Sequence, residues 1–303
     1  MNKVIYDRHA EAWEKVLKES GRHAIGESWI DNKKTLDKWR HFRMYKLLSP
    51  LMSLIELSWL TVGDGRYGTD AIALKRMGVK HIHCSDISDT LLKIAAKNGL
   101  IDKFSEQNAE SMSFKDEQFD FVLCKEAYHH FPRPHLALHE MLRVCKIGVV
   151  LIEPRHFRID TPPLYFLVRF AKWCLRRSKN SHHRFEEIGN YICSVSEKEL
   201  EKFQLSMHRR YIAINGINDV YEKGGEFINL DSKLSGEQKI IKKVRRKIWI
   251  LNLLCKFGFY KTNLVTSILF KGKPSSKILK ALSNSGWRID ILPENPYLFR
   301  NES

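Results

Sequence analysis

The sequence predicts an α/β fold built on a doubly wound, mostly parallel sheet. From about residue 56, short apolar runs alternate with stretches that have the spacing of amphipathic helices. This order produces parallel strands that helices cover on both faces. The first run, LSWLTV at 57–62, continues directly into a glycine-rich turn and a helix. Open α/β sheets bind their ligands at such strand ends, so a ligand site is expected where the first strand ends.

The composition is that of an ordinary globular protein. The 303 residues suffice for one enlarged domain or two ordinary ones, and 43% hydrophobic with 28% charged residues exclude a disordered or fibrous chain. Six cysteines without a C-x-x-C pair indicate reduced thiols. No apolar stretch approaches the roughly 20 residues of a membrane span, and the amino terminus has no apolar signal core. We therefore expect a cytoplasmic protein, either free or peripheral at the inner face of the membrane.

The charge is strongly and unevenly positive. Lys and Arg number 51 against 35 Asp and Glu, a net charge of +16. Residues 1–150 have a net charge of +3, and residues 151–303 have +13. Such an excess favours an anionic partner, which can be a nucleic acid, a phosphate-bearing metabolite or an anionic membrane surface. The second half of the chain is the part expected to meet it.

Residues 1–55 are expected to form a helical preface. Residues 4–20 and 35–49 have the spacing of amphipathic helices, and the second should end at Ser49-Pro50, because proline breaks the helical pattern. Residues 56–155 are expected to form the first half of the core, which would bind a cofactor. In this half we expect strands near 57–62, 80–85, 103–107, 119–124 and 147–152, and helices near 69–77, 89–98 and 134–145.

Residues 156–195 are expected to be a basic helical insertion, TPPLYFLVRFAKWCLRRSKNSHHR, that interrupts the alternation. Thr161 can cap a helix that has Pro162 at its first position. Two interpretations fit this helix: it lies in an anionic membrane surface, or it is a buried structural helix with a solvated cationic edge. Its cations are Arg169, Lys172, Arg176, Arg177 and Lys179.

Residues 196–303 are expected to complete the core and to form the tail. A helix opens at the capping box Ser196-Glu197-Lys198-Glu199. Strands near 209–214 and 263–270 flank a long helix at 239–256 and complete a seven-stranded sheet. The tail from residue 275 offers one helix and a final extended piece.

The glycine turn has the features of a nucleotide-type cofactor site. It runs Gly63-Asp64-Gly65-Arg66-Tyr67-Gly68, where glycines let the backbone approach a ligand and the next helix offers free N–H groups. Asp86 ends the second strand, where a carboxylate can accept both hydroxyls of a ribose. Alternatively, Asp86 caps the following helix. These features fit a nicotinamide cofactor as well as S-adenosylmethionine.

The following segments distinguish the two cofactors. Residues 108–124, NAESMSFKDEQFDFVLC, closely resemble the D-A-E-x-L-P-F-x-D-x-x-F-D-x-V stretch of class I S-adenosylmethionine-dependent methyltransferases. Residues 128–134, YHHFPRP, and the following HLALHEMLRVCKIGVVLIEP resemble the H-H-x-x-D-P and E-x-x-R-V-L-K-P-G-G patterns of that family. The resemblance covers about residues 56–155 and is looser to type 11-like enzymes of bacterial surface-polysaccharide biosynthesis. It implies a Rossmann-like sheet and S-adenosylmethionine as the cofactor.

The resemblance also implies which residues contact the cofactor. In that family the glycine turn lies against the methionine half, the acid after the second strand holds ribose, and an Asp-Ala pair packs on adenine. Thr61 stands where an acid usually lies near the methionine amine, a charge that Asp64 or Asp70 can supply instead. Asn108 replaces the adenine-contacting Asp, and the turn is one residue wider than G-x-G-x-G. The residues assigned to the cofactor are Gly63, Asp64, Gly65, Asp86, Ile87, Asn108, Ala109 and Lys125.

Other candidate site residues follow from position. A hydroxyl acceptor needs a base, and His129 and His130 lie just beyond the fourth strand, although each can equally be a structural histidine packed beside Phe131. Glu126 in the same loop is the next candidate base. On the preface, two arginines either cover the cofactor carboxylate or form a solvated face. These are Arg40 and Arg43.

A metal site is not expected, because the close histidine pairs lack a matching cysteine or carboxylate cluster. These pairs are His81 with His83 and His182 with His183. The leading function is methyl transfer to an oxygen atom of a small or glycan-linked acceptor. RNA methylation suits the basic second half, but the fourth strand ends in Cys124-Lys125-Glu126-Ala127 and not in an N-P-P-Y turn. An inactive cofactor-binding adaptor of a membrane-associated synthesis complex is the remaining alternative, because Thr61 lacks the usual charge.

Overall fold

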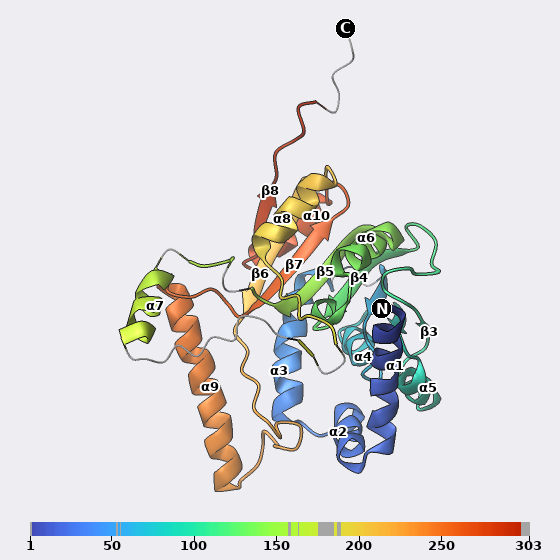
Figure 1. Ribbon diagram of the computed structural model, residues 1–303, viewed down its shortest axis with the longest axis vertical. Helices are drawn as coiled ribbons and strands as arrows, with labels where there is room; N and C mark the ends of the chain where they lie inside the picture. Colours follow the sequence, from blue (N-terminus) through green and yellow to red (C-terminus); the bar gives the residue numbers. More distant parts are fainter. Residues whose placement is uncertain are drawn as a thin grey trace.

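A computed structural model of the chain describes residues 2–297 except 53, 55, 157, 158, 163, 175–184, 187 and 188. These residues form one sheet of eight strands with helices on both faces (Figure 1). The strand order is β3-β2-β1-β4-β5-β7-β6-β8. The α/β fold class expected from the sequence is confirmed, and the core of the sheet is mostly parallel.

The first five strands run parallel, and the last three pair antiparallel. The expected number of seven strands is not confirmed, because part of the tail pairs with β6 as an eighth strand, β8. The strands are β1 (Ser58–Val62), β2 (His81–Asp86), β3 (Phe104–Glu106), β4 (Phe119–Lys125), β5 (Cys145–Pro154), β6 (Tyr211–Ile217), β7 (Leu264–Phe270) and β8 (Arg288–Ile291).

Alternate residues of the central strands enter two cores, one on each face of the sheet. In β4, Val122 and Cys124 pack under α6 (Pro134–Val144) and α8 (Glu197–Ser206). Phe121 and Leu123 pack on the opposite face with residues of α4, α10 and the end of the preface. Burial on both faces explains why the strands are almost continuously apolar. The helices α4 (Thr69–Arg76), α5 (Thr90–Lys97) and α10 (Ser276–Asn284) complete the layers.

The preface contains one more helix than the sequence pattern suggested. It consists of α1 (Asn2–Lys18), α2 (Ser20–Ile30), α3 (Leu36–Tyr45) and the 3₁₀ helix η1 (Lys46–Leu51). The unexpected α2 has two glycines and little amphipathic pattern, so periodicity did not reveal it. The helix expected to end at Ser49-Pro50 ends at Tyr45, and the tighter η1 accommodates Pro50.

The start of α7 (Tyr165–Cys174) and the capping contact of α8 differ from the expected ones, although α8 opens at the expected residue. The helix α7 begins at Tyr165 and not beside Pro162. The Ser196 hydroxyl does not cap α8, because it donates to Asp160, whose other carboxylate oxygen accepts from the Glu197 backbone N–H. A distant acid thus replaces the expected capping box. The long helix α9 spans Ser235–Lys256. Outside the described residues lie Arg176, Arg177, Lys179, His182 and His183.

Candidate functional site

A cavity of about 380 Å³ lies where β1, β2 and β4 end, with α1 contributing to its wall. Its size suits a small-molecule ligand. The structure brings most of the expected site residues to this cavity. Gly65 and His129 lie beside it but are not among the lining residues. Those that line it are Gly63, Asp64, Asp86, Ile87, Asn108, Ala109, Lys125, Glu126 and His130.

The glycine turn packs too tightly for side chains at two of its positions. Gly63 has φ +74°, and a Cβ there would lie 2.4 Å from the Cβ of Ala127. A Cβ on Gly65 would lie 2.6 Å from the Asp86 carboxylate. Tyr67, which stands where the G-x-G-x-G pattern has its third glycine, takes the left-handed conformation with φ 57°. The turn therefore keeps the backbone geometry of a glycine site even at a residue that is not glycine.

Asp86 is buried at the end of β2 and holds the glycine turn. Its carboxylate accepts hydrogen bonds from the backbone N–H of Gly65 at 2.8 Å and of Ser88 at 3.1 Å. The indole of Trp13, from α1, also hydrogen-bonds to it. Burial raises the pKa of Asp86 to about 6 despite these donors. Asp86 is thus an acceptor already surrounded by donors at the position that the sequence assigned to ribose.

The two acids considered as substitutes at Thr61 both have partners in the fold. Asp64 accepts from the backbone N–H groups of Asp70 and Ala71 at 2.9 Å, and from the Thr61 hydroxyl at 2.8 Å. It therefore provides the hydrogen-bond acceptor for free backbone N–H groups in the first turn of α4. Burial raises the pKa of Asp64 to about 8. Asp70 accepts from the Tyr45 hydroxyl at 2.5 Å and lies 3.3 Å from the Lys125 ammonium.

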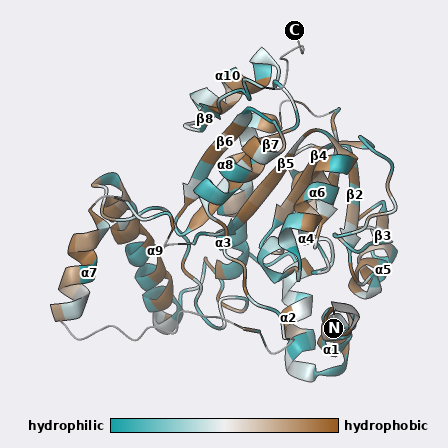
Figure 2. Ribbon diagram, turned by 45° about the horizontal axis from the view of Figure 1, so that its top comes forward, coloured by the Kyte–Doolittle hydropathy of each residue, from teal (hydrophilic) through white to brown (hydrophobic). Residues whose placement is uncertain are grey.

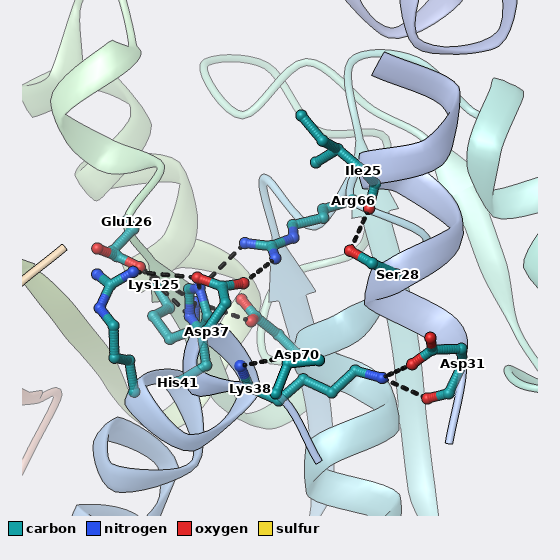
Figure 3. A network of polar contacts seen from close by, with 12 residues as sticks. Ile25, Ser28, Asp31, Asp37, Lys38, His41, Arg66, Asp70, Lys125 and Glu126 are labelled. Carbon is teal, nitrogen blue, oxygen red and sulfur yellow. Dashed lines mark hydrogen bonds and ion pairs between the residues drawn. The ribbon is translucent and has the colours of Figure 1, made fainter. Parts of the chain in front are cut away.

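A polar network connects α3 to the end of β4 (Figure 3). The Glu126 carboxylate lies 3.6 Å from Lys125 and 3.5 Å from His41. Glu126 has φ 51°, a left-handed conformation that is unusual for a side chain of this kind. Burial raises its pKa, but Lys125, His41 and Arg40 together hold the pKa below the usual value. Glu126 is therefore an anion at neutral pH and a weak base.

The two adjacent histidines have different surroundings. His129 is buried, and its Nδ1 lies 2.5 Å from the Glu153 carboxylate, which also accepts from the Ala127 and Tyr128 backbone N–H groups. Burial lowers the pKa of His129, but the Glu153 charge and hydrogen bond outweigh it and raise the pKa. His130 lines the cavity, and its Nδ1 lies 2.7 Å from the Glu186 carboxylate. The structure thus separates an inner pair from an outer one.

The remaining assigned residues lie as follows. Asn108 and Ala109 line the cavity, and the Asn108 side-chain oxygen accepts from the Glu110 backbone N–H at 2.9 Å. Arg40 forms ion pairs with Asp37 and Asp219, while Arg43 donates to a backbone carbonyl. Neither arginine is among the residues that line the cavity.

Sequence reasoning missed several polar groups around the cavity. Glu153 carried a recognisable signal, an acid at the end of an otherwise apolar strand. The other residues, which come from the preface, the glycine turn and the insertion, gave no such signal, because only tertiary packing brings them to the cavity. These residues are Trp13, His41, Arg66 and Glu186.

Two buried nitrogen atoms in the cavity wall indicate that it fits a polar ligand. Nε2 of His9 and Nε of Arg66 have no hydrogen-bond partner within the described residues. Buried polar groups are normally satisfied, so such atoms mark places where a ligand can supply the partner. Arg66 suits a carboxylate, and Asp86 suits hydroxyls. The cavity residues therefore fit an amino acid joined to a nucleoside, as S-adenosylmethionine is.

Residues 60–152 match the family model described as a methyltransferase domain. This match covers β1 to β5, the strands that form the cavity. The match supports the interpretation of this segment as part of a class I S-adenosylmethionine-dependent methyltransferase. The match therefore also supports S-adenosylmethionine as the cofactor.

Two curated relatives share part of the chain. The uncharacterized methyltransferase YcgJ of Bacillus subtilis is 29% identical over 98 residues, which are 32% of this chain and 38% of that protein. The ubiquinone/menaquinone biosynthesis C-methyltransferase UbiE of Bartonella quintana is 26% identical over 180 residues, 56% of this chain and 66% of that protein. The matches thus span about two fifths and about two thirds of these relatives.

Solved structures show a likeness at lower identity. The YcgJ protein of Bacillus subtilis has a TM-score of 0.44 at 18% identity, covering 76% of this chain and all of that one. Magnesium protoporphyrin IX methyltransferase of Synechocystis PCC 6803, crystallised with bound SAH, has a TM-score of 0.47 at 13% identity, covering 74% and 94%. The support for the cofactor comes from the family match over β1 to β5.

Proposed function

We propose that this protein transfers a methyl group from S-adenosylmethionine to a hydroxyl oxygen of a small or glycan-linked acceptor. The observation that carries the proposal is the His130 imidazole in the cavity wall, with the Glu186 carboxylate 2.7 Å from its Nδ1. The cofactor supplies an activated methyl group when bound. His130 then takes the proton of the acceptor hydroxyl through its other ring nitrogen, while the Glu186 carboxylate lies beside Nδ1 on the far side of the ring.

His129 acts as a positioning residue in this proposal. Its ring centroid lies 3.9 Å from that of His130, and its own Nδ1 is engaged with buried Glu153. Glu153 also anchors the backbone of Ala127 and Tyr128, so it fixes the loop that carries both histidines. The inner pair thus holds the outer histidine in place.

Carbon methylation is a second candidate, because the Bartonella relative is named a C-methyltransferase. A base beside the cavity also serves this reaction if the acceptor is a phenol-like ring whose deprotonation activates a carbon. The identity of the methylated atom in the product distinguishes the two reactions.

The acceptor class is tested by transfer of labelled methyl from S-adenosylmethionine into separated lipid, glycan and RNA fractions. We expect label in the glycan or small-molecule fraction, bound through oxygen. Label in RNA would overturn the proposed acceptor, and label bound to carbon would favour the second candidate. Cofactor binding without transfer into any fraction would favour an inactive adaptor.

We further propose that Glu126 replaces the acid missing at Thr61 and binds the methionine amine. Asp64 and Asp70 also line the cavity, but backbone N–H groups of α4 and the Tyr45 hydroxyl already donate to them. The Glu126 carboxylate has only the longer ion-pair contacts with His41 and Lys125 described above, and it stays ionised. The variant Glu126→Gln keeps the size of the side chain but removes its charge. Since a hydrogen bond to a charged group contributes about 1.5–3 kcal/mol, affinity for the cofactor should fall about 10- to 100-fold.

Calorimetric titration with S-adenosylhomocysteine measures this change. Glu117→Gln provides a matched control, because Glu117 also has a left-handed backbone but lies outside the cavity lining. Unchanged affinity in the Glu126 variant would remove this assignment.

A further inference from the structure

The helix α7 presents an aromatic face to solvent. Phe166, Phe170 and Trp173 are 62%, 63% and 70% exposed, and their spacing places them on one side of the helix. Phe170 and Trp173 lie with their ring centroids 5.9 Å apart. The interpretation of this segment as a buried structural helix predicted that such residues would be covered. The structure shows the opposite.

The second half of α9 continues this apolar surface. One face of α9 buries Ile241, Val244 and Ile248 against the preface and the loop before α9. The opposite face leaves four large apolar side chains exposed at helical spacing. They are Trp249, Ile250, Leu253 and Phe257.

The start of α7 and the end of α9 lie next to each other. The Tyr165 ring packs edge-on against Tyr260, just after α9, with 5.5 Å between ring centroids. α7 lies beside α9 and away from the sheet (Figure 1), and it is largely hydrophobic in Figure 2. We name the seven exposed residues the α7–α9 patch: Phe166, Phe170, Trp173, Trp249, Ile250, Leu253 and Phe257.

A cationic stripe leads directly into the patch. Lys239, Lys242 and Arg246 are exposed and lie on the same side of α9 as Trp249 and Leu253. Glu237 is the one acidic residue within α9. Helices that lie in a membrane interface combine cations that meet lipid phosphates with aromatic residues that enter the headgroup region. The stripe and the patch provide both parts.

We propose that the α7–α9 patch docks on an anionic lipid bilayer, with the stripe on lipid phosphates. The charge favours this occupant, because a second copy of the chain would bring its own cationic stripe against the first. No helix among the described residues is long and apolar enough to cross a membrane, so the contact lies at the surface. The patch rests on residues outside the cavity, and the inference is independent of the proposed methyl transfer.

The test is sedimentation of the full chain with lipid vesicles. One set contains phosphatidylcholine with about a third phosphatidylglycerol, and the other contains phosphatidylcholine alone. The protein should sediment with the anionic vesicles at low salt and be released at high salt, since salt screens the lipid charge. Trp173→Ser with Trp249→Ser should reduce binding at least about tenfold, because both exposed indoles lose their place in the interface.

Two further variants keep the test decisive. Replacement of Lys239, Lys242 and Arg246 by Gln removes charge without touching the patch and should lower binding about fivefold per cation. The matched control is Leu136→Ser with Leu205→Ser, which removes exposed apolar side chains of α6 and α8 and should bind like the wild type. Cofactor affinity should stay unchanged in all three, which shows that each variant folds.

Three outcomes would overturn the proposal. The first is failure of the wild type to sediment with anionic vesicles at low salt. The second is equal binding to neutral and anionic vesicles. The third is a dimer in analytical ultracentrifugation that dissociates when Trp173 and Trp249 are replaced, since the patch would then be covered by a second copy.

Discussion

Replacement of His130 by alanine should lower turnover about 10²- to 10⁴-fold, while affinity for the cofactor stays nearly unchanged. This loss is expected because His130, unlike the neighbouring His129, lines the cavity and lies beside Glu186. Removal of the imidazole leaves the acceptor without a positioned base. Steady-state kinetics together with titration of S-adenosylhomocysteine separate turnover from cofactor binding.

The neighbouring histidine should behave differently. His129→Ala leaves the fully buried Glu153 carboxylate without its charged partner, so the free energy of unfolding should fall by about 3–5 kcal/mol. Because the pKa of His129 is raised in the fold, the stability it contributes is present at low pH and is lost as the pH rises through that pKa. Chemical denaturation measures this free energy of unfolding.

Full activity of the His130→Ala variant would show that another group acts as the base.

A control for the histidine variants lies on α6. His135 stacks on Phe203, away from the cavity lining, so His135→Ala should leave turnover near that of the wild type. A comparable loss in this variant would show that the effect at His130 is not specific to the cavity.

Replacement of Asp86 by alanine should weaken cofactor binding at least about tenfold, because two hydrogen bonds from ribose to a charged acceptor contribute about 1.5–3 kcal/mol each. The Trp13 indole now donates to this carboxylate, so ribose hydroxyls would take its place. Asp89→Ala is a matched control, since Asp89 carries the same charge on the same loop but lies outside the cavity lining. Equal losses in the two variants would argue against a ribose contact at Asp86.

The pH dependence of binding provides an independent check on Asp86. Its pKa is about 6 in the free protein, so the carboxylate gains a proton as the pH falls below that value. A protonated carboxyl accepts ribose hydroxyls poorly, and affinity should therefore decrease by up to about tenfold per pH unit below pH 6. The Asp86→Ala variant should lack this dependence.

The succession of strands and helices along the chain could be predicted because each apolar run is a local signal. Val122 and Phe121 belong to opposite faces of β4, and both faces are buried, so the strand is apolar throughout. The eighth strand was harder to predict, since Arg288–Ile291 is short, half polar and defined only by pairing with β6. The start of α8 at Ser196 was predicted, but the contact of Asp160 with its first turn was not, because Asp160 lies far from Ser196 along the chain.

The candidate site, too, was predictable where its features are local in the sequence and not where they depend on distant segments. The glycine turn and Asp86 are read from neighbouring residues, and the structure places both at one cavity edge. The sequence could not separate His129 from His130, because their difference depends on Glu153 and Glu186, which come from other segments. The exposed aromatic face of α7 also required the structure, since a periodic apolar pattern does not say which face another element covers.

The most direct test of the central claim is a calorimetric titration of the wild-type protein with S-adenosylhomocysteine and, separately, with a nicotinamide dinucleotide. The cavity at the ends of β1, β2 and β4 predicts saturable binding of S-adenosylhomocysteine at one site, and no binding of the dinucleotide. Binding of the nicotinamide dinucleotide without binding of S-adenosylhomocysteine would contradict the proposal that this protein is an S-adenosylmethionine-dependent methyltransferase.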